Sequence, residues 1–155
     1  MSLAIDISKR YEIAPAEGYA GDVSPTDTWR MLTEISDATL IDVRTAAEWA
    51  YVGTPDMRTL GKALVTIEWQ TFPSMQIDPD FVAKLMQHVG ADRDVPLLML
   101  CRSGARSAAA AKAMTAAGYR CCFNVVSGFE GTVDDAGHRG VTSGWKADGL
   151  PWSQK

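Results

Sequence analysis

The sequence predicts a layered α/β fold in which helices cover both faces of a parallel sheet. Segments typical of strands alternate with segments typical of helices along most of the chain. The strand-like segments are mostly apolar without regular alternation, which indicates strands that are buried on both faces rather than on one. A repeated order of strand, helix, strand and helix is typical of a parallel sheet with helices packed on each side.

The first helix begins where Ser24 can cap it and Pro25 can occupy its first position. Its apolar positions lie on one face, and we expect it to end near Ser36. Residues 1–21 are mixed in character and broken by proline and glycine. We interpret them as an arm that lies over a single domain formed by residues 22–155.

The later elements follow in alternation, with glycines closing the longer helices. Asp78-Pro79 opens one helix, and Gly90 and Gly118 each follow a helix. We expect short β-branched or apolar strands and amphipathic or alanine-rich helices in the following ranges: strands at 39–43, 63–67, 96–100 and 121–126, and helices at 45–51, 78–90 and 105–117.

Composition and net charge exclude several classes of function. A chain of 155 residues with 46% hydrophobic and 22% charged residues is ordinary for one globular domain. The formal charge of −4 argues against a general nucleic-acid or anionic-membrane binder. No apolar run approaches the ~18 residues of a membrane span, and the charged N-terminal segment does not indicate export. We therefore expect a cytoplasmic protein, in which an odd count of three cysteines leaves at least one thiol free or paired with another molecule.

Ligand sites of parallel α/β sheets lie at the carboxyl ends of the strands. That rule points to residues 42–44, 101–107 and 127–131. The second of these segments carries the chemistry: Cys101-Arg102-Ser103-Gly104-Ala105-Arg106-Ser107 lies between a buried strand and a helix N-terminus.

Three effects act together on the Cys101 sulfur. Free backbone N–H groups at the helix start attract an anion, and the helix dipole adds positive potential there. Arg102 and Arg106 add two cations. Each effect favours the thiolate, which is the nucleophilic form of cysteine. The alternative is that Cys101 merely finishes a strand beside two solvated arginines; the combination with Gly104 and a helix start favours the nucleophile.

This loop resembles the active-site loop of the rhodanese superfamily, the single-domain sulfurtransferases. Other stretches resemble the family in the same order, over about residues 22–152: Ile41-Asp42-Val43-Arg44 with Glu48-Trp49 and Gly53, Lys62-Ala63, Val126-Ser127-Gly128-Phe129, and Gly149-Leu150-Pro151. The chain departs from the family at residues 54–58, at Gly128-Phe129-Glu130-Gly131, and by an insert at 132–144 before Trp145. These departures concern the rim of the site.

The resemblance implies a three-layer fold with about five parallel strands. It implies that Cys101 takes a sulfane sulfur from a donor such as thiosulfate, carries it as a persulfide, and delivers it to cyanide, a thiol or a protein. The loop residues 102–107 would bind the small anionic donor, with Arg102 and Arg106 supplying charge and no metal or organic cofactor required. Asp42, Arg44 and Glu48 would position the loop, with Arg44 paired to Glu48; a salt-bridged strand end without a catalytic part is an equal alternative.

Two other functions stay open. Phosphatase or arsenate-reductase chemistry occurs on the same fold, but those enzymes place five residues between cysteine and arginine, whereas four separate Cys101 from Arg106. A non-catalytic binding or regulatory module would not need Cys101. The sequence does not determine the oligomeric state.

Several other residues attract attention. We expect Cys121 and Cys122, adjacent on a strand, to be two buried thiols, and His138 to lie in a polar surface loop. Trp145 could line the cleft or pack in the core.

Overall fold

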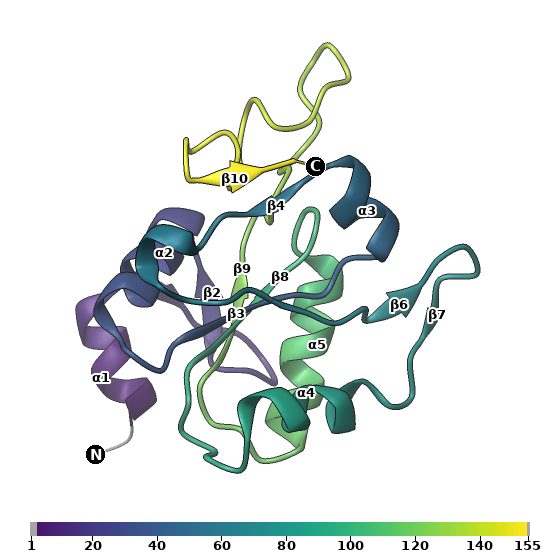
Figure 1. Ribbon diagram of the computed structural model, residues 1–155. Coiled ribbons are helices and arrows are strands. Elements are labelled where there is room, and N and C mark those ends of the chain that lie inside the picture. The colour runs from purple at the N-terminus through teal and green to yellow at the C-terminus, as the bar shows by residue number, and fades with distance from the viewer. Residues whose placement is uncertain (1–2, 155) are drawn as a thin grey trace.

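A six-stranded sheet crosses the middle of the molecule in the computed structural model, which describes residues 3–154 (Figure 1). Its strand order is β1-β2-β9-β8-β3-β5. The last five of these are mutually parallel, and β1 joins β2 as an antiparallel edge strand. The strands are β1 (Ile13–Ala14), β2 (Gly21–Val23), β3 (Thr39–Asp42), β5 (Val65–Thr66), β8 (Leu97–Leu100) and β9 (Cys122–Val125). The α/β class and the parallel sheet are thus as predicted.

Helices cover both faces of this sheet. The helices α1 (Leu3–Arg10) and α2 (Pro25–Glu34) pack on one face, and α4 (Phe81–Val89) and α5 (Ala105–Ala116) pack on the other (Figure 1). Successive strand residues point to opposite faces. Leu98 and Leu100 of β8 therefore join the core cluster under α1 and α2, whereas Leu97 and Met99 join the cluster under α4 and α5.

The helix starts follow local sequence chemistry. Ser24 Oγ accepts a hydrogen bond from the backbone N–H of Asp27, which caps α2 as the sequence predicts. Thr45 and Glu48 form a reciprocal capping box at α3 (Ala46–Tyr51), a helix that begins one residue after the predicted start.

The region expected to be an arm is more ordered than the sequence pattern indicates. It contains α1, β1 and the start of β2, and Ile7 and Tyr11 are buried in the core. β2 supplies the fifth parallel strand, through its register with β9. Its three residues, Gly-Asp-Val, are too few to form a periodic pattern, so this strand was not predicted from the sequence.

Short elements surround the sheet, with β4 and β10 above it and the β6–β7 hairpin projecting to the right in Figure 1. Strand β4 (Thr54–Pro55) pairs with β10 (Trp152–Ser153), β6 (Gln70–Thr71) pairs with β7 (Gln76–Ile77) in a projecting hairpin, and a 3-10 turn, η1, spans Arg58–Leu60. The insert at 132–144 contains turns and bends only. Trp145 after it is fully buried, with its ring edge-on to Trp29 at 5.8 Å between centroids, so it belongs to the core rather than to the cleft.

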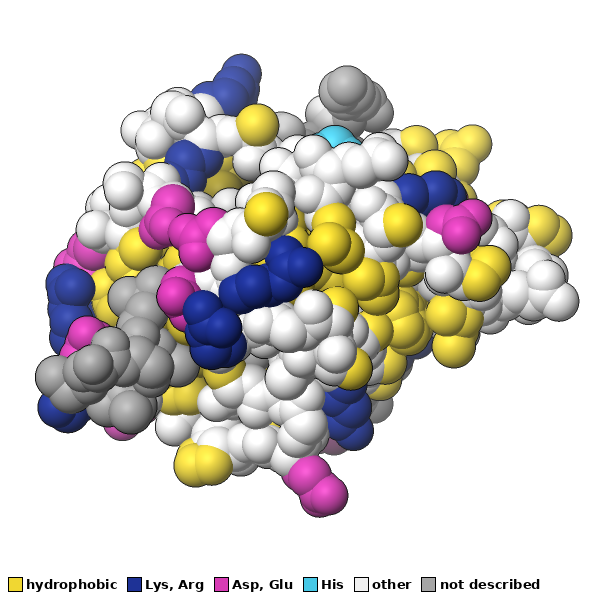
Figure 2. All heavy atoms as spheres, turned by 90° about the horizontal axis from the view of Figure 1, so that it is seen from below, with side chains coloured by type: hydrophobic (Ala, Val, Ile, Leu, Met, Phe, Trp, Pro, Cys, Tyr) yellow, Lys and Arg dark blue, Asp and Glu magenta, His cyan; other side chains and the backbone are white. Residues whose placement is uncertain are grey.

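The surface carries interspersed charges. On the face shown in Figure 2, basic and acidic side chains lie among apolar and uncharged ones and form no continuous basic surface. Within residues 3–154, no helix is both long and apolar enough to cross a membrane.

Candidate active site around Cys101

The strand-end segments predicted to carry the site lie together at one edge of the sheet. Asp42 at the end of β3 is level with Leu100 at the end of β8, and Cys101 follows directly. The backbone N–H of Phe129, after β9, donates to the Cys101 carbonyl at 2.8 Å. Gly128 allows this close approach, because a Cβ there would lie 2.4 Å from the same carbonyl oxygen. The loop is therefore held from both neighbouring strands.

The Cys101 side chain is only 1% exposed, and two donors reach its sulfur. The Gly104 backbone N–H and the Ser107 hydroxyl each lie 3.1 Å from Sγ. Gly104 adopts a left-handed conformation, with φ of 116°, and α5 begins at the next residue. The sulfur thus lies before the N-terminus of a twelve-residue helix, where N–H groups and the helix dipole favour an anion.

A hollow of about 300 Å³ opens over this loop. Its lining comes from the loop, from α3 and from the β6–β7 hairpin: Glu48, Gln70, Met75, Cys101, Arg102, Ser103, Ala105 and Arg106. Arg102 is exposed at the rim. A second hollow of about 370 Å³ is largely apolar and shares Glu48 and Met75 with the first. Gln70 and Met75 were not predicted, because nothing in the sequence indicates that the β6–β7 hairpin folds over the loop that begins at Cys101.

Arg106 forms a bidentate ion pair with Glu48. The two nitrogen–oxygen distances are 2.7 and 2.9 Å. Burial opposes ionisation of Glu48, but hydrogen bonds from Arg106 and Thr45 outweigh it and lower the Glu48 pKa to about 2. The same pair raises the pKa of Arg106. The Arg106 charge in the hollow is therefore largely compensated by a carboxylate.

Arg44 does not pair with Glu48, and that expectation is wrong. It forms a fully buried ion pair with Asp42, with Nη2 to Oδ2 at 2.7 Å, and also donates to the Gly53 carbonyl at 2.7 Å. The Arg44 side chain turns back along its own strand end because Asp42, two residues away, offers both carboxylate oxygens. Its guanidinium carbon lies 4.4 Å from the centre of the Phe129 ring. The pair therefore supports the loop from behind, through Phe129, without touching the sulfur.

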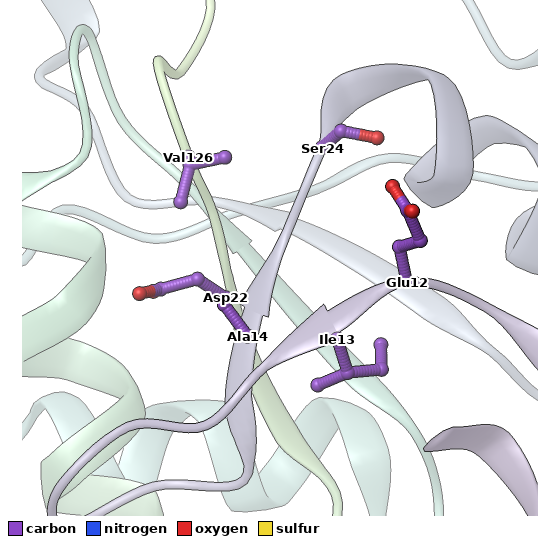
Figure 3. Close-up of a pocket in the computed structure, with 6 residues that line it drawn as sticks. All are labelled: Glu12, Ile13, Ala14, Asp22, Ser24 and Val126. Atoms are coloured by element: carbon purple, nitrogen blue, oxygen red, sulfur yellow. The ribbon is translucent and has the colours of Figure 1, made fainter. Parts of the chain in front are cut away.

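A buried polar chain leads away from the sulfur on the opposite side. Ser107 Oγ lies 2.5 Å from Asn124 Oδ1, and Asn124 Nδ2 donates to Asp22 Oδ1 at 3.0 Å. Asp22 and Asn124 are register partners on β2 and β9. Figure 3 shows a further hollow, between β1 and β2, that Asp22 also lines; in this view the Asp22 side chain projects to the side of β2 opposite Glu12. Tyr19 also donates to Asp22, and burial followed by this hydrogen bond raises the Tyr19 pKa to about 12.

The other sequence candidates lie away from the site. Cys121 and Cys122 are both buried, as expected, and burial raises the pKa of Cys122 to about 12. His138 lies in the exposed insert, where its backbone N–H donates to Asp134.

A family model for the STR4 middle domain matches residues 20–155. The chain belongs to this family. It is 34% identical over 131 residues to the uncharacterized protein RP600 of Rickettsia prowazekii, covering 84% of this chain and 95% of that protein. It is 27% identical over 133 residues to the protein THYLAKOID RHODANESE-LIKE of Oryza sativa subsp. indica, covering 86% of this chain and 25% of that protein.

Comparison with solved structures also finds proteins of similar fold. Rv0390 from M. tuberculosis is 45% identical, with a TM-score of 0.81, over 88% of this chain and 99% of that one. The polysulfide-sulfur transferase homodimer of Wolinella succinogenes, at 24% identity and a TM-score of 0.54, covers 86% of this chain and 78% of that one, and shares the fold. The family member described here thus has a rhodanese-like fold, as the sequence resemblance implied.

Proposed function

We propose that this protein is a sulfurtransferase that carries a sulfane sulfur on Cys101 as a persulfide. The observation that carries the proposal is the sulfur's environment: the Cys101 thiol is buried, with the Gly104 backbone N–H and the Ser107 hydroxyl each 3.1 Å from Sγ, before a helix N-terminus and beneath a hollow of about 300 Å³. The Gly104 backbone N–H is already directed at the sulfur, so it needs no rearrangement when negative charge develops there.

The chemistry balances in two displacements. The Cys101 thiolate attacks the outer sulfur of thiosulfate; the S–S bond of thiosulfate breaks, and sulfite leaves with the bonding electron pair. The acceptor, cyanide or a thiolate, then attacks the terminal sulfur of the Cys101 persulfide. Thiocyanate or the acceptor's persulfide departs, and the Cys101 thiolate is regenerated. No metal or organic cofactor takes part in either step.

Arg102 and Arg106 have different roles toward an anionic donor. Arg102 at the exposed rim attracts the anion, whereas Arg106, held by Glu48, shapes the wall of the hollow. Of the two arginines that line the hollow in the described part of the chain, Arg106 is paired with Glu48 and Arg102 is not, which suits a small anion that must enter, react and leave. A reducing cytoplasm would keep the Cys101 thiol available for this cycle.

Steady-state kinetics with thiosulfate and cyanide test the proposal. We expect thiocyanate formation with the parallel reciprocal plots of a ping-pong mechanism, because the persulfide separates the two half-reactions. Cys101→Ser should abolish turnover while leaving the unfolding transition unchanged, and the buried-thiol variant Cys122→Ala should retain turnover. Full activity in Cys101→Ser, or turnover of an aryl phosphate in place of thiosulfate, would contradict the proposal.

A further inference from the structure

The Ser107 hydroxyl faces two acceptors with one proton. It lies 3.1 Å from Cys101 Sγ and 2.5 Å from Asn124 Oδ1, and the Ser107 side chain is fully buried. A hydroxyl has a single O–H to donate. It can therefore serve the sulfur or the amide oxygen, but not both at once.

Asp22 determines which atom of Asn124 faces Ser107. A carboxylate accepts hydrogen bonds and donates none, so the amide nitrogen of Asn124 must point to Asp22 and the amide oxygen to Ser107. The parallel register of β2 and β9 places Asp22 and Asn124 side by side. Asn124 is 5% exposed, so water does not readily replace either bond.

We propose that Asn124, oriented by Asp22, is a positioning residue that governs the protonation preference of Cys101 through the Ser107 hydroxyl. In the thiol form, the Cys101 S–H donates to Ser107 Oγ, and the Ser107 O–H donates to Asn124 Oδ1. When the thiol releases its proton to solvent, the Ser107 O–H turns to the sulfur, and Asn124 Oδ1 loses its donor. Asn124 thus opposes the thiolate.

The charged groups around the sulfur stay constant in a test that changes only Asn124. They come from every element packed near the loop: Arg102 in the loop, Arg106 on α5 with Glu48 on α3, Asp42 on β3 and Asp22 on β2. Asn124→Leu removes the competing acceptor without altering any of these charges.

The experiment measures the alkylation rate of Cys101 by iodoacetamide against pH in the full chain, with peptide mass analysis to confirm the modified residue. Asn124→Leu should lower the pH midpoint by about one unit, the equivalent of one neutral hydrogen bond. In the Ser107→Ala background, Asn124→Leu should leave the midpoint unchanged, because the connecting hydroxyl is absent.

A second variant covers the case in which Asn124→Leu does not fold. Asp22→Ala frees the Asn124 amide to turn, so the midpoint should fall further with Ser107 present than in the Ser107→Ala background; the part common to both backgrounds reflects the lost charge. An unchanged midpoint in Asn124→Leu, or equal shifts in both backgrounds, would overturn the proposal. The proposal about Asn124 rests on the proposed function only in taking Cys101 as the reacting thiol. Because the readout is alkylation, failure of sulfur transfer would count against the proposed function alone.

Discussion

The Glu48–Arg106 ion pair contributes stability whose size and pH dependence follow from the structure. The Glu48 pKa falls from an ordinary 4.5 to about 2. Each pKa unit corresponds to ~1.4 kcal/mol, so linkage gives roughly 3 kcal/mol as an upper limit. The two side chains are 19% and 17% exposed, and solvent screening reduces the expected contribution to about 1–2 kcal/mol.

Glu48→Gln removes the charge and keeps the shape. We expect a loss of about 1–2 kcal/mol in the free energy of unfolding at pH 7, because Arg106 loses its counter-charge while glutamine still accepts neutral hydrogen bonds. Since the folded-state pKa is depressed, the contribution is fully present above pH 4.5 and is lost as the pH falls to about 2. The difference between variant and wild type should therefore shrink by roughly half or more at pH 3.

Urea unfolding followed by tryptophan fluorescence measures both quantities. The exposed Glu17, substituted in the same way, controls for the loss of one carboxylate. Equal stability of Glu48→Gln and the wild type at pH 7, or a difference that does not change between pH 7 and pH 3, would refute this reasoning.

Three further changes probe other parts of the site. Asp42→Ala leaves Arg44 buried without its counter-charge, and should lower stability by about 3–5 kcal/mol in urea unfolding; a loss below ~1 kcal/mol would show that the pair is dispensable. Gly128→Ala should slow Cys101 alkylation, because its Cβ would collide with the backbone of the loop, whereas Gly61→Ala, with open space around it, should not. Equal rates in the two would contradict this. Arg102→Gln should raise the thiosulfate KM about 3- to 10-fold with little change in kcat; an unchanged KM would show that the donor does not meet Arg102.

The sequence predicted the main strands and helices because their apolar runs and caps are local signals. The run 96–100 and the cap at Ser24 are both recovered within a residue or two. β2 escaped prediction because three residues show no periodicity, and it becomes a strand only by pairing with β9. Sheet pairing between distant segments decides such elements, and a single sequence does not display it.

The candidate site was likewise predictable only where the signal is local in the sequence. The position of Cys101 at a strand end before a helix was readable, since strand, loop and helix are consecutive in the chain. The ion pairs could not be predicted from the sequence. Arg44 pairs with Asp42, two residues away, and Glu48 pairs with Arg106, 58 residues away. Asn124, Gln70 and Met75 carry no motif and reach the loop only through the tertiary fold.

Sulfur loading of Cys101 is the direct test of the proposed persulfide mechanism. The protein is incubated with thiosulfate, freed of excess donor, and weighed by intact-mass spectrometry with peptide mapping. We expect one added sulfur on Cys101, removed by cyanide with release of thiocyanate, and no addition in Cys101→Ser. An unmodified mass under these conditions, or the added sulfur on Cys121 or Cys122 instead, would contradict it.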